Sequence, residues 1–307
     1  MTENTLRDLL SIGDLSRLTG VPVRTLRFYC DDGILESRRS GGGHRMFDPV
    51  TAVDRVVLLR RLRALGLSLA AITEVLTGAR SIGEVVAAER AALDTELGVL
   101  AWRRASLRAV EDAPHPERAA RLELLAAVQD RHRAHDGLVA FWRRLLTPIP
   151  PAMFDGFVAM NIPDLPADPA PRQLVAFAEL VTRAADPALS VVMSRQLWRA
   201  NRSEIHDRPG LVTGVAEACM SVDSDGLIDT EPRPGAELDH FMAAHADARR
   251  VCDTPRFRRQ LLAAAADGDE RIHRYWQLTS EITETSNAGA ALDWLYQALT
   301  RSVAAAA

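Results

Sequence analysis

Several polar side chains at the start of one short helical segment are spaced to donate hydrogen bonds together. The segment runs over residues 23–30 and carries Arg24, Thr25 and Arg27 in its first turns, with Tyr29 one turn on. An arginine guanidinium pairs bidentately with guanine, and a threonine hydroxyl reaches bases or phosphates. The segment therefore has the chemistry to contact the base edges of nucleic acid.

Two further groups of cations follow this segment. Gly41, Gly42 and Gly43 form the tip of an expected hairpin or wing, where the backbone can approach phosphates and His44 and Arg45 add donors. The second group lies on a later helix and consists of Arg60, Arg61 and Arg63. Phosphate contacts fix the register of a protein on DNA and carry little sequence information. Each arginine alone also fits a solvated surface, but the combination favours nucleic-acid binding.

The elements that must hold these side chains are short helices with clear ends. Ile12, Leu15 and Leu18 form an apolar stripe, Ser11 is a suitable N-cap, and Gly20 is a suitable stop. A three-residue turn then leads into the next helix, which is the spacing of a helix-turn-helix. The residues expected to form the hydrophobic core of this region are Leu15, Leu18, Val21, Leu26, Leu35 and Phe47.

Three more helices are expected before residue 113. One is capped by Asp48 and stopped by Gly66, and a short one over residues 67–76 begins at the N-cap Ser68. The third is a single long helix over residues 81–112. Its apolar residues recur with a heptad period: Val86, Leu93, Leu97, Leu100 and Leu107.

This heptad pattern predicts a coiled-coil seam of about four heptads. An exposed seam needs a partner, so we expect a homodimer. The alternative is that the stripe packs against the C-terminal part of the same chain.

Charge is distributed unevenly along the 307 residues. The net charge is −4, all 37 basic residues are arginine, and residues 1–80 hold 12 arginines against nine acidic residues. The overall charge excludes a uniformly basic nucleic-acid coat but allows a local basic face. No apolar stretch is long enough to cross a membrane, and the three scattered cysteines favour a reduced, cytoplasmic protein, associated with the nucleoid.

Residues 11–76 contain a set of submotifs in order. They are IGDL from Ile12, TGVPVRTLRFY from Thr19, GIL from Gly33, GGHRMF from Gly42, and RLRALGLSLAAI from Arg61 to Ile72. This stretch resembles the DNA-binding domain of the MerR family of transcription regulators over its whole length. Phe28, Cys30 and Asp31 depart from the family pattern, and the proline that commonly follows Leu35 is absent.

The resemblance implies a winged helix-turn-helix that binds double-stranded promoter DNA as a homodimer. Such dimers bind a palindromic operator in a promoter spacer and distort it on effector binding, so that RNA polymerase can engage. The residues expected to contact DNA are Arg24, Thr25, Arg27, Tyr29, His44, Arg45, Arg60, Arg61 and Arg63.

We expect a mainly α protein with three parts. They are a winged helix-turn-helix over residues 1–77, a coiled-coil dimerisation helix over 78–113 and an all-α effector domain over 114–307. Pro114 and Pro116 end the long helix. Seven prolines between Thr147 and Pro171 indicate a long irregular crossing.

Metal and cofactor chemistry is disfavoured in the effector domain. The metal-sensing branch of the family uses cysteines at the start of the long helix and in a short loop beyond it, and this sequence has none at either place. His132 and His135 are close in sequence but lie in a charged run, and the acidic run Asp223–Gly226 lacks the glutamate that a calcium loop needs. No metal or cofactor is therefore expected.

Aromatic residues are enriched in the second half of the chain and suggest a pocket for an organic effector. The residues proposed for its wall are Phe141, Trp142, Trp198, Phe241, Tyr275, Trp276 and Trp294. The acidic residues Glu179, Glu204, Asp223 and Glu231 would favour a cationic effector. Alternatively, most of these rings are core, and the domain docks a protein partner. An enzyme fused to a DNA-binding domain is disfavoured, because no catalytic fingerprint is present.

Overall fold

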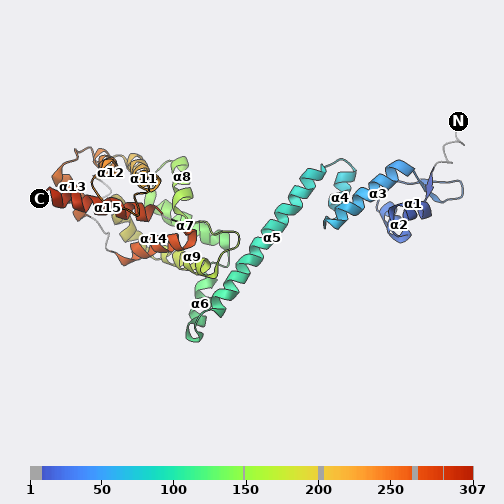
Figure 1. Cartoon of the computed structure of the whole chain (residues 1–307), viewed down its shortest axis with the longest axis horizontal. Helices are drawn as coiled ribbons and strands as arrows, with labels where there is room; N and C mark the ends of the chain where they lie inside the picture. The colour runs from blue at the N-terminus through green and yellow to red at the C-terminus, as the bar shows by residue number, and fades with distance from the viewer. Residues whose placement is uncertain (1–8, 148, 200–203, 265–268, 286, 307) are drawn as a thin grey trace. The chain divides into compact units, whose positions relative to one another are not determined.

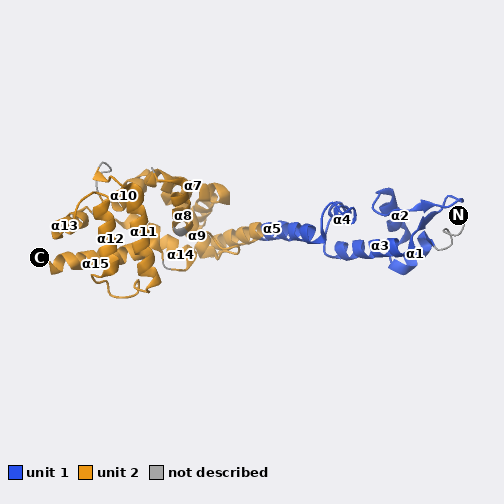
Figure 2. Cartoon of the chain, turned by 90° about the horizontal axis from the view of Figure 1, so that it is seen from above, with its two compact units in different colours: residues 1–97 blue, residues 98–307 orange. Residues whose placement is uncertain are grey.

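The computed structural model describes residues 9–147, 149–199, 204–264, 269–285 and 287–306. The chain is mainly helical, as predicted (Figure 1). It divides into two compact units, residues 1–97 and 98–307, and the division falls inside one long helix (Figure 2). Within the described residues, no helix combines the length and apolarity that a bilayer crossing requires.

Unit 1 is a helical domain with a small sheet. Its elements are β1 (Leu10–Ser11), α1 (Ile12–Thr19), α2 (Val23–Asp31), β2 (Arg38–Arg39), β3 (Arg45–Phe47), α3 (Pro49–Ala64) and α4 (Leu69–Leu76). The strands form an antiparallel sheet in the order β1-β3-β2. β2 and β3 make the predicted glycine-tipped hairpin, in which Arg39 lies opposite Arg45. The hairpin is the wing of a winged helix-turn-helix.

Local signals set the ends of these helices as predicted. Ser11 caps α1 in a reciprocal capping box with Asp14, and Gly20 ends it with a positive φ of 69°. Asp48 caps α3 by accepting from two backbone N–H groups, and Ser68 caps α4. Residues next to each turn therefore determine where one element of the winged helix-turn-helix ends and the next begins.

The core of unit 1 differs from the prediction at one position. Leu15, Val21, Leu26, Leu35 and Phe47 are buried, as expected. Leu18 is 64% exposed, so its prediction as core was wrong. In the last turn of α1 the buried position is Thr19, four residues after Leu15 on the same face of the helix, and Leu18 beside it faces solvent.

The long helix α5 runs from Ile82 to Glu111 without interruption. Val86, Leu93, Leu97, Leu100 and Leu107 are all exposed in the single chain. Leu100 and Leu107, which belong to unit 2, are therefore not covered by the rest of that unit. On another face, Ala105 and Ala109 are buried against unit 2, to which the C-terminal half of the helix belongs.

Unit 2 is all helical. After the short 3₁₀ turn η1 (His115–Glu117), its elements are α6 (Arg118–Ala126), α7 (Arg131–Leu146), α8 (Pro151–Asn161), α9 (Pro171–Ala184), α10 (Pro187–Trp198), α11 (Arg208–Ser224), α12 (Ala236–Asp247), α13 (Pro255–Ala263), α14 (Glu270–Thr283) and α15 (Ala288–Ala305). They surround two hydrophobic clusters. The first lies mainly among α6, α7, α9, α10 and α14, and the second among α11, α12, α13 and α15.

The proline-rich segment after Thr147 contains a helix, which corrects the prediction of an irregular crossing. α8 begins at Pro151, where proline is tolerated because the first helical N–H has no partner inside the helix. Pro163, Pro166 and Pro169 lie in the irregular stretch 162–170 between α8 and α9, so this part of the prediction is confirmed. Pro171 is the first residue of α9.

Candidate nucleic-acid interface and ligand cavity

One face of α2 is exposed and carries the predicted base-reading side chains. Arg24 and Arg27 are exposed, and Phe28 beside them is 47% exposed, while Thr25 is half-buried. Residues 24, 27 and 28 share one helix face because they are spaced i, i+3, i+4. Neither guanidinium makes a hydrogen bond or ion pair among the described residues. This face is called the α2 reading face.

Tyr29 does not belong to the α2 reading face. It is 8% exposed and packs in the core with Leu26, three residues earlier on the same side of the helix. Its backbone oxygen accepts from Ile34 and Leu35 and so holds the turn that follows. Its predicted contact with bases through the ring is therefore corrected to a packing role, and Phe28 takes its place on the surface.

The wing is linked to α2 by Arg45. The Arg45 guanidinium pairs with the Asp31 carboxylate and donates to the Arg27 carbonyl oxygen at 3.4 Å. Hydrogen bonding to Asp31 raises the pKa of Arg45. Arg45 thus positions the wing as well as carrying charge, while His44 at the tip is exposed.

Between α2 and the wing lies a hollow of about 430 Å³. The arginine and histidine side chains of its lining come from both elements: Arg27, Arg39, His44 and Arg45. Arg39 is not among the DNA contacts expected from the sequence. Its register opposite Arg45 on the hairpin is the signal that brings it here.

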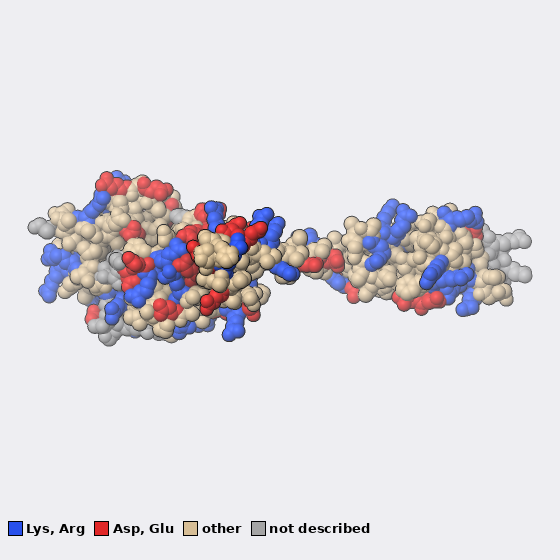
Figure 3. All heavy atoms as spheres, turned by 90° about the horizontal axis from the view of Figure 1, so that it is seen from below, with Lys and Arg blue, Asp and Glu red and all other residues tan. Residues whose placement is uncertain are grey.

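The arginines at the end of α3 divide into two roles. Arg60 donates to the Thr19 carbonyl at 3.0 Å and Arg63 donates to the Leu67 carbonyl at 2.6 Å, so both hold neighbouring turns together. The Arg61 side chain is exposed and has no such bond within the residues that the structure describes. All three keep their charge near the surface. On the visible face of unit 1 in Figure 3, basic atoms outnumber acidic ones, whereas unit 2 shows both mixed.

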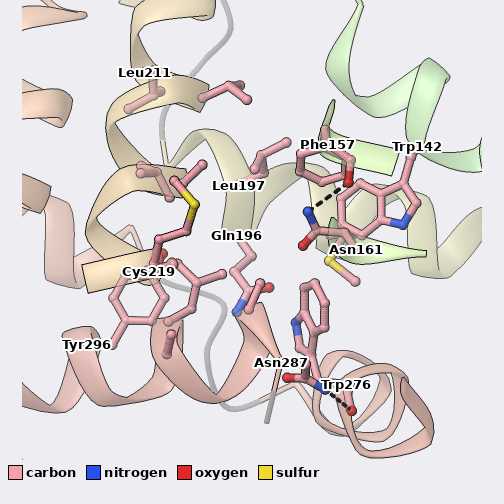
Figure 4. A pocket seen from close by; sticks show the side chains of 18 of the residues that line it. Trp142, Phe157, Asn161, Gln196, Leu197, Leu211, Cys219, Trp276, Asn287 and Tyr296 are labelled. Atoms are coloured by element: carbon pink, nitrogen blue, oxygen red, sulfur yellow. Dashed lines mark hydrogen bonds between the residues drawn. The ribbon is translucent and has the colours of Figure 1, made fainter. Parts of the chain in front are cut away.

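Unit 2 contains a partly open cavity of about 310 Å³ between its two hydrophobic clusters. Side chains of α7, α8, α10, α11, α12, α14 and α15 line it (Figure 4). Its aromatic wall consists of Trp142, Phe157, Trp198, Trp276 and Tyr296. The size and apolar lining are those of a site for a small organic molecule.

Three of the seven predicted effector residues line the cavity: Trp142, Trp198 and Trp276. The other four, Phe141, Phe241, Tyr275 and Trp294, are core side chains outside the lining. Tyr275 lies directly behind the wall, where its hydroxyl accepts from the Trp142 indole at 2.7 Å. Sequence reasoning did not propose Gln196 or Asn161 for the wall, because nothing in their local sequence separates them from other amides.

The acidic residues do not surround the cavity as a cationic effector would require. Glu179 is held by Arg183 and Arg274, and Glu231 pairs with Arg301; neither lines the cavity. Asp223 does line it but is exposed at its edge. Within the described part of the chain, no group of three or more histidine, cysteine, aspartate or glutamate side chains could hold a metal ion.

His245 lines the cavity in its neutral form. Burial, with Arg249 and Arg199 nearby, lowers the pKa of the imidazole well below its usual 6.5. Arg249 Nη1 lies 3.1 Å from His245 Nδ1, and because arginine only donates, Nδ1 is the acceptor. The hydrogen of the neutral ring is thus on Nε2, which has no partner among the described residues.

Two residues position the Trp276 wall. Asn287 donates to the Trp276 carbonyl at 2.7 Å and to Ser280, and its side-chain oxygen caps α15 by accepting from Ala290. Gly289 lies so close to the indole that a Cβ there would overlap it. The start of α15 and the ring of Trp276 are therefore fixed together.

Comparison with known proteins is informative for unit 1. The family described as MerR HTH family regulatory protein matches residues 10–79. The nodulation protein NolA of Bradyrhizobium elkanii is 47% identical over 72 residues, which are 23% of this chain and 32% of NolA. The HTH-type transcriptional regulator HmrR of Rhizobium leguminosarum bv. viciae is 37% identical over 59 residues, 19% of this chain and 45% of HmrR.

The matches are confined to the N-terminal part, so the chain spans about a third of the length of NolA and under half of HmrR. No solved structure matches the chain. The fold of unit 1, with its capped helices, turn and wing, defines a winged helix-turn-helix. Residues 10–79 are a MerR-family helix-turn-helix domain, as the sequence motifs predicted.

Proposed function

We propose that this protein is a DNA-binding transcription regulator that recognises promoter DNA through the α2 reading face. The observation that carries the proposal is the pair of exposed guanidinium groups, Arg24 and Arg27, which make no bond among the described residues. A free arginine on a recognition helix is able to pair with guanine in the major groove. The α2–wing hollow and Arg61 supply charge for the flanking phosphates.

The active form in this proposal is a homodimer joined along α5. Five apolar side chains at heptad spacing stay exposed in the single chain, and a second α5 would cover them. Two copies of unit 1 would then meet a palindromic operator, as MerR-family regulators do. Distortion of that operator, with RNA polymerase at the same promoter, would be the regulatory step. Its place of action is the cytoplasm, where promoter DNA lies.

The effector is proposed to be an organic small molecule held in the cavity of unit 2. The aromatic wall and the volume of about 310 Å³ support a small ligand over a protein surface, which would contact an exposed patch. No catalytic role is proposed: burial raises the pKa of Cys219, the thiol of the lining, to about 12, and no hydrogen bond joins it to His245. Docking of a protein partner by unit 2 is the second candidate.

The test is binding of the purified protein to DNA of its own promoter, followed by fluorescence anisotropy at increasing salt. A dimer that contacts several phosphates should lose about 1,000-fold or more in affinity between about 50 mM and 200 mM salt. Native mass spectrometry of the same sample should give the mass of two chains. Salt-independent or absent binding would reject the regulator, and a single-chain mass would reject the dimer.

A further inference from the structure

The lining of the unit 2 cavity contains two largely buried residues whose side-chain amides keep hydrogen-bonding capacity that the fold does not use. Gln196 on α10 is 8% exposed and makes no hydrogen bond within the described residues. Asn161 at the end of α8 is 6% exposed and donates to the Phe157 carbonyl at 3.0 Å, which leaves its side-chain oxygen without a partner there. The buried polar atoms of the lining that have no partner are the indole N–H groups of Trp198 and Trp276 and Nε2 of His245. Because buried polar groups are normally satisfied, these atoms, together with the open amide atoms, point to a ligand.

The amides face the space where a ligand would lie. Figure 4 shows Gln196 among the lining side chains, with Asn161 and the Trp276 ring on the side opposite Cys219 and Tyr296. The Asn161 oxygen points away from its bond to Phe157 and toward this space. Gln196 also borders a second hollow of about 230 Å³ that shares Trp276 and Tyr296, so its amide stands where the two spaces meet.

The lining of the cavity offers an ionised ligand no ion-pair partner in its interior. It contains no arginine, and His245 is neutral. The buried Arg199 and Arg249 lie behind the wall, against the Tyr296 ring and the His245 imidazole. The one carboxylate of the lining, Asp223, is exposed. An ionised ligand would therefore leave water without pairing directly with an opposite charge.

From this arrangement we propose that the cavity selects an uncharged aromatic compound that carries a carboxamide or lactam group. The ring would lie against Trp142, Phe157 and Trp276. Its amide would exchange hydrogen bonds with Gln196, which both donates and accepts, and donate to the Asn161 oxygen. The unpartnered N–H groups of Trp276 and His245 add donors for a carbonyl oxygen. This inference rests on the proposed role of the cavity as the effector site.

The test compares four probes that share one ring system: naphthamide, naphthoate, naphthylmethylammonium and naphthalene. Binding to the full chain is measured by quenching of tryptophan fluorescence and by isothermal titration calorimetry. Naphthamide should bind at least about tenfold more tightly than each of the others, because a satisfied buried amide is worth about 1–3 kcal/mol. Equal or tighter binding of either ion, or of naphthalene, would overturn the proposal.

Gln196→Met removes the amide at nearly constant size. It should bring the affinity for naphthamide to within about threefold of that for naphthalene. Gln260→Met, on an exposed position of α13, should change neither. The thermal unfolding midpoint of each variant is recorded as a check of folding. If Gln196→Met does not fold, Trp276→Phe, which keeps an aromatic ring but removes the indole N–H, replaces it as the test variant.

Unchanged selectivity in Gln196→Met, or no binding of any probe, would overturn the inference. DNA binding by the same preparations is measured in parallel. Intact DNA binding with failed probe selectivity rejects the ligand class alone, whereas lost DNA binding in the wild-type protein rejects the proposed regulator.

Discussion

Unit 1 and unit 2 hold their candidate functional groups in opposite ways. On α2, Arg24 and Arg27 are exposed and their positions follow from one helix and its N-terminal turn. In unit 2, Gln196 and Asn161 are buried and meet only because α8 and α10 pack around the same space. An exposed charge suits a partner that is itself charged and hydrated, such as DNA. A buried neutral amide suits a small molecule that leaves water completely.

The largest expected effect tests whether α5 joins two copies of unit 1. Leu100→Asp places a charge in the exposed heptad seam and should convert the dimer to single chains. Affinity for promoter DNA should fall by about 10²–10⁴-fold, because the second half-site no longer adds its binding. Analytical ultracentrifugation and anisotropy measure the two changes.

Thr95→Asp is the matched control for this variant, because Thr95 is exposed on α5 but outside the seam. It should remain dimeric with wild-type affinity. A dimeric Leu100→Asp protein would show that the seam is not the interface.

Removal of one reading arginine should have the next largest effect. Arg24→Ala or Arg27→Ala should each reduce affinity for the operator by about tenfold to a hundredfold and relax sequence preference at one base. Anisotropy with the operator and with point-substituted operators gives both values. Arg233→Ala, an exposed arginine of unit 2, should leave binding unchanged, and equal losses in the two units would contradict the assignment of DNA contacts to α2.

The third prediction concerns the wall of the cavity. Gly289→Ala forces a Cβ into the Trp276 indole and should destabilise unit 2 by about 1–3 kcal/mol while weakening naphthamide binding. Gly137→Ala is the matched control: its Cβ would meet open space on α7, so it should stabilise the helix by about 0.5–1 kcal/mol. Urea unfolding measures both. If Gly289→Ala changed neither the free energy of unfolding nor the affinity for naphthamide, the start of α15 would not position the cavity wall.

The smallest effect depends on pH and involves His245. Because burial lowers its pKa in the folded state, the unfolded chain binds the proton first as pH falls below 6.5. Stability from this group is present above pH 6.5 and is lost below it, by at most about 1.4 kcal/mol per pH unit. His245→Gln should flatten the urea-unfolding profile between pH 6.5 and about 5. If the free energy of unfolding of His245→Gln kept the wild-type slope against pH, the pH dependence would come from other groups.

Most of unit 1 could be predicted from sequence because its signals are local. Ser11, Gly20 and Asp48 act within a few residues of the turn that each one forms. Tyr29 was misassigned although its spacing from Leu26 already placed both on one side of α2. The i, i+3, i+4 spacing from Arg24 would have placed Phe28, and not Tyr29, on the exposed face of α2.

For the cavity of unit 2, the sequence predicted only that aromatic residues would form its wall. Trp142, Trp198 and Trp276 line it, but Tyr275 beside Trp276 points into the core. Side chains on seven helices form the wall, and which face of each helix turns inward is decided by packing between residues up to about 150 positions apart. No local pattern distinguishes Gln196 from an exposed glutamine such as Gln260.

Hydroxyl-radical footprinting of the intact protein on its own promoter tests the central claim most directly. A dimer reading DNA through two α2 faces should protect two symmetric half-sites whose centres lie about 10–10.5 base pairs, or a multiple of that, apart. Altered reactivity between the half-sites would report distortion of the spacer. A single protected half-site, or uniform protection without symmetry, would contradict the account.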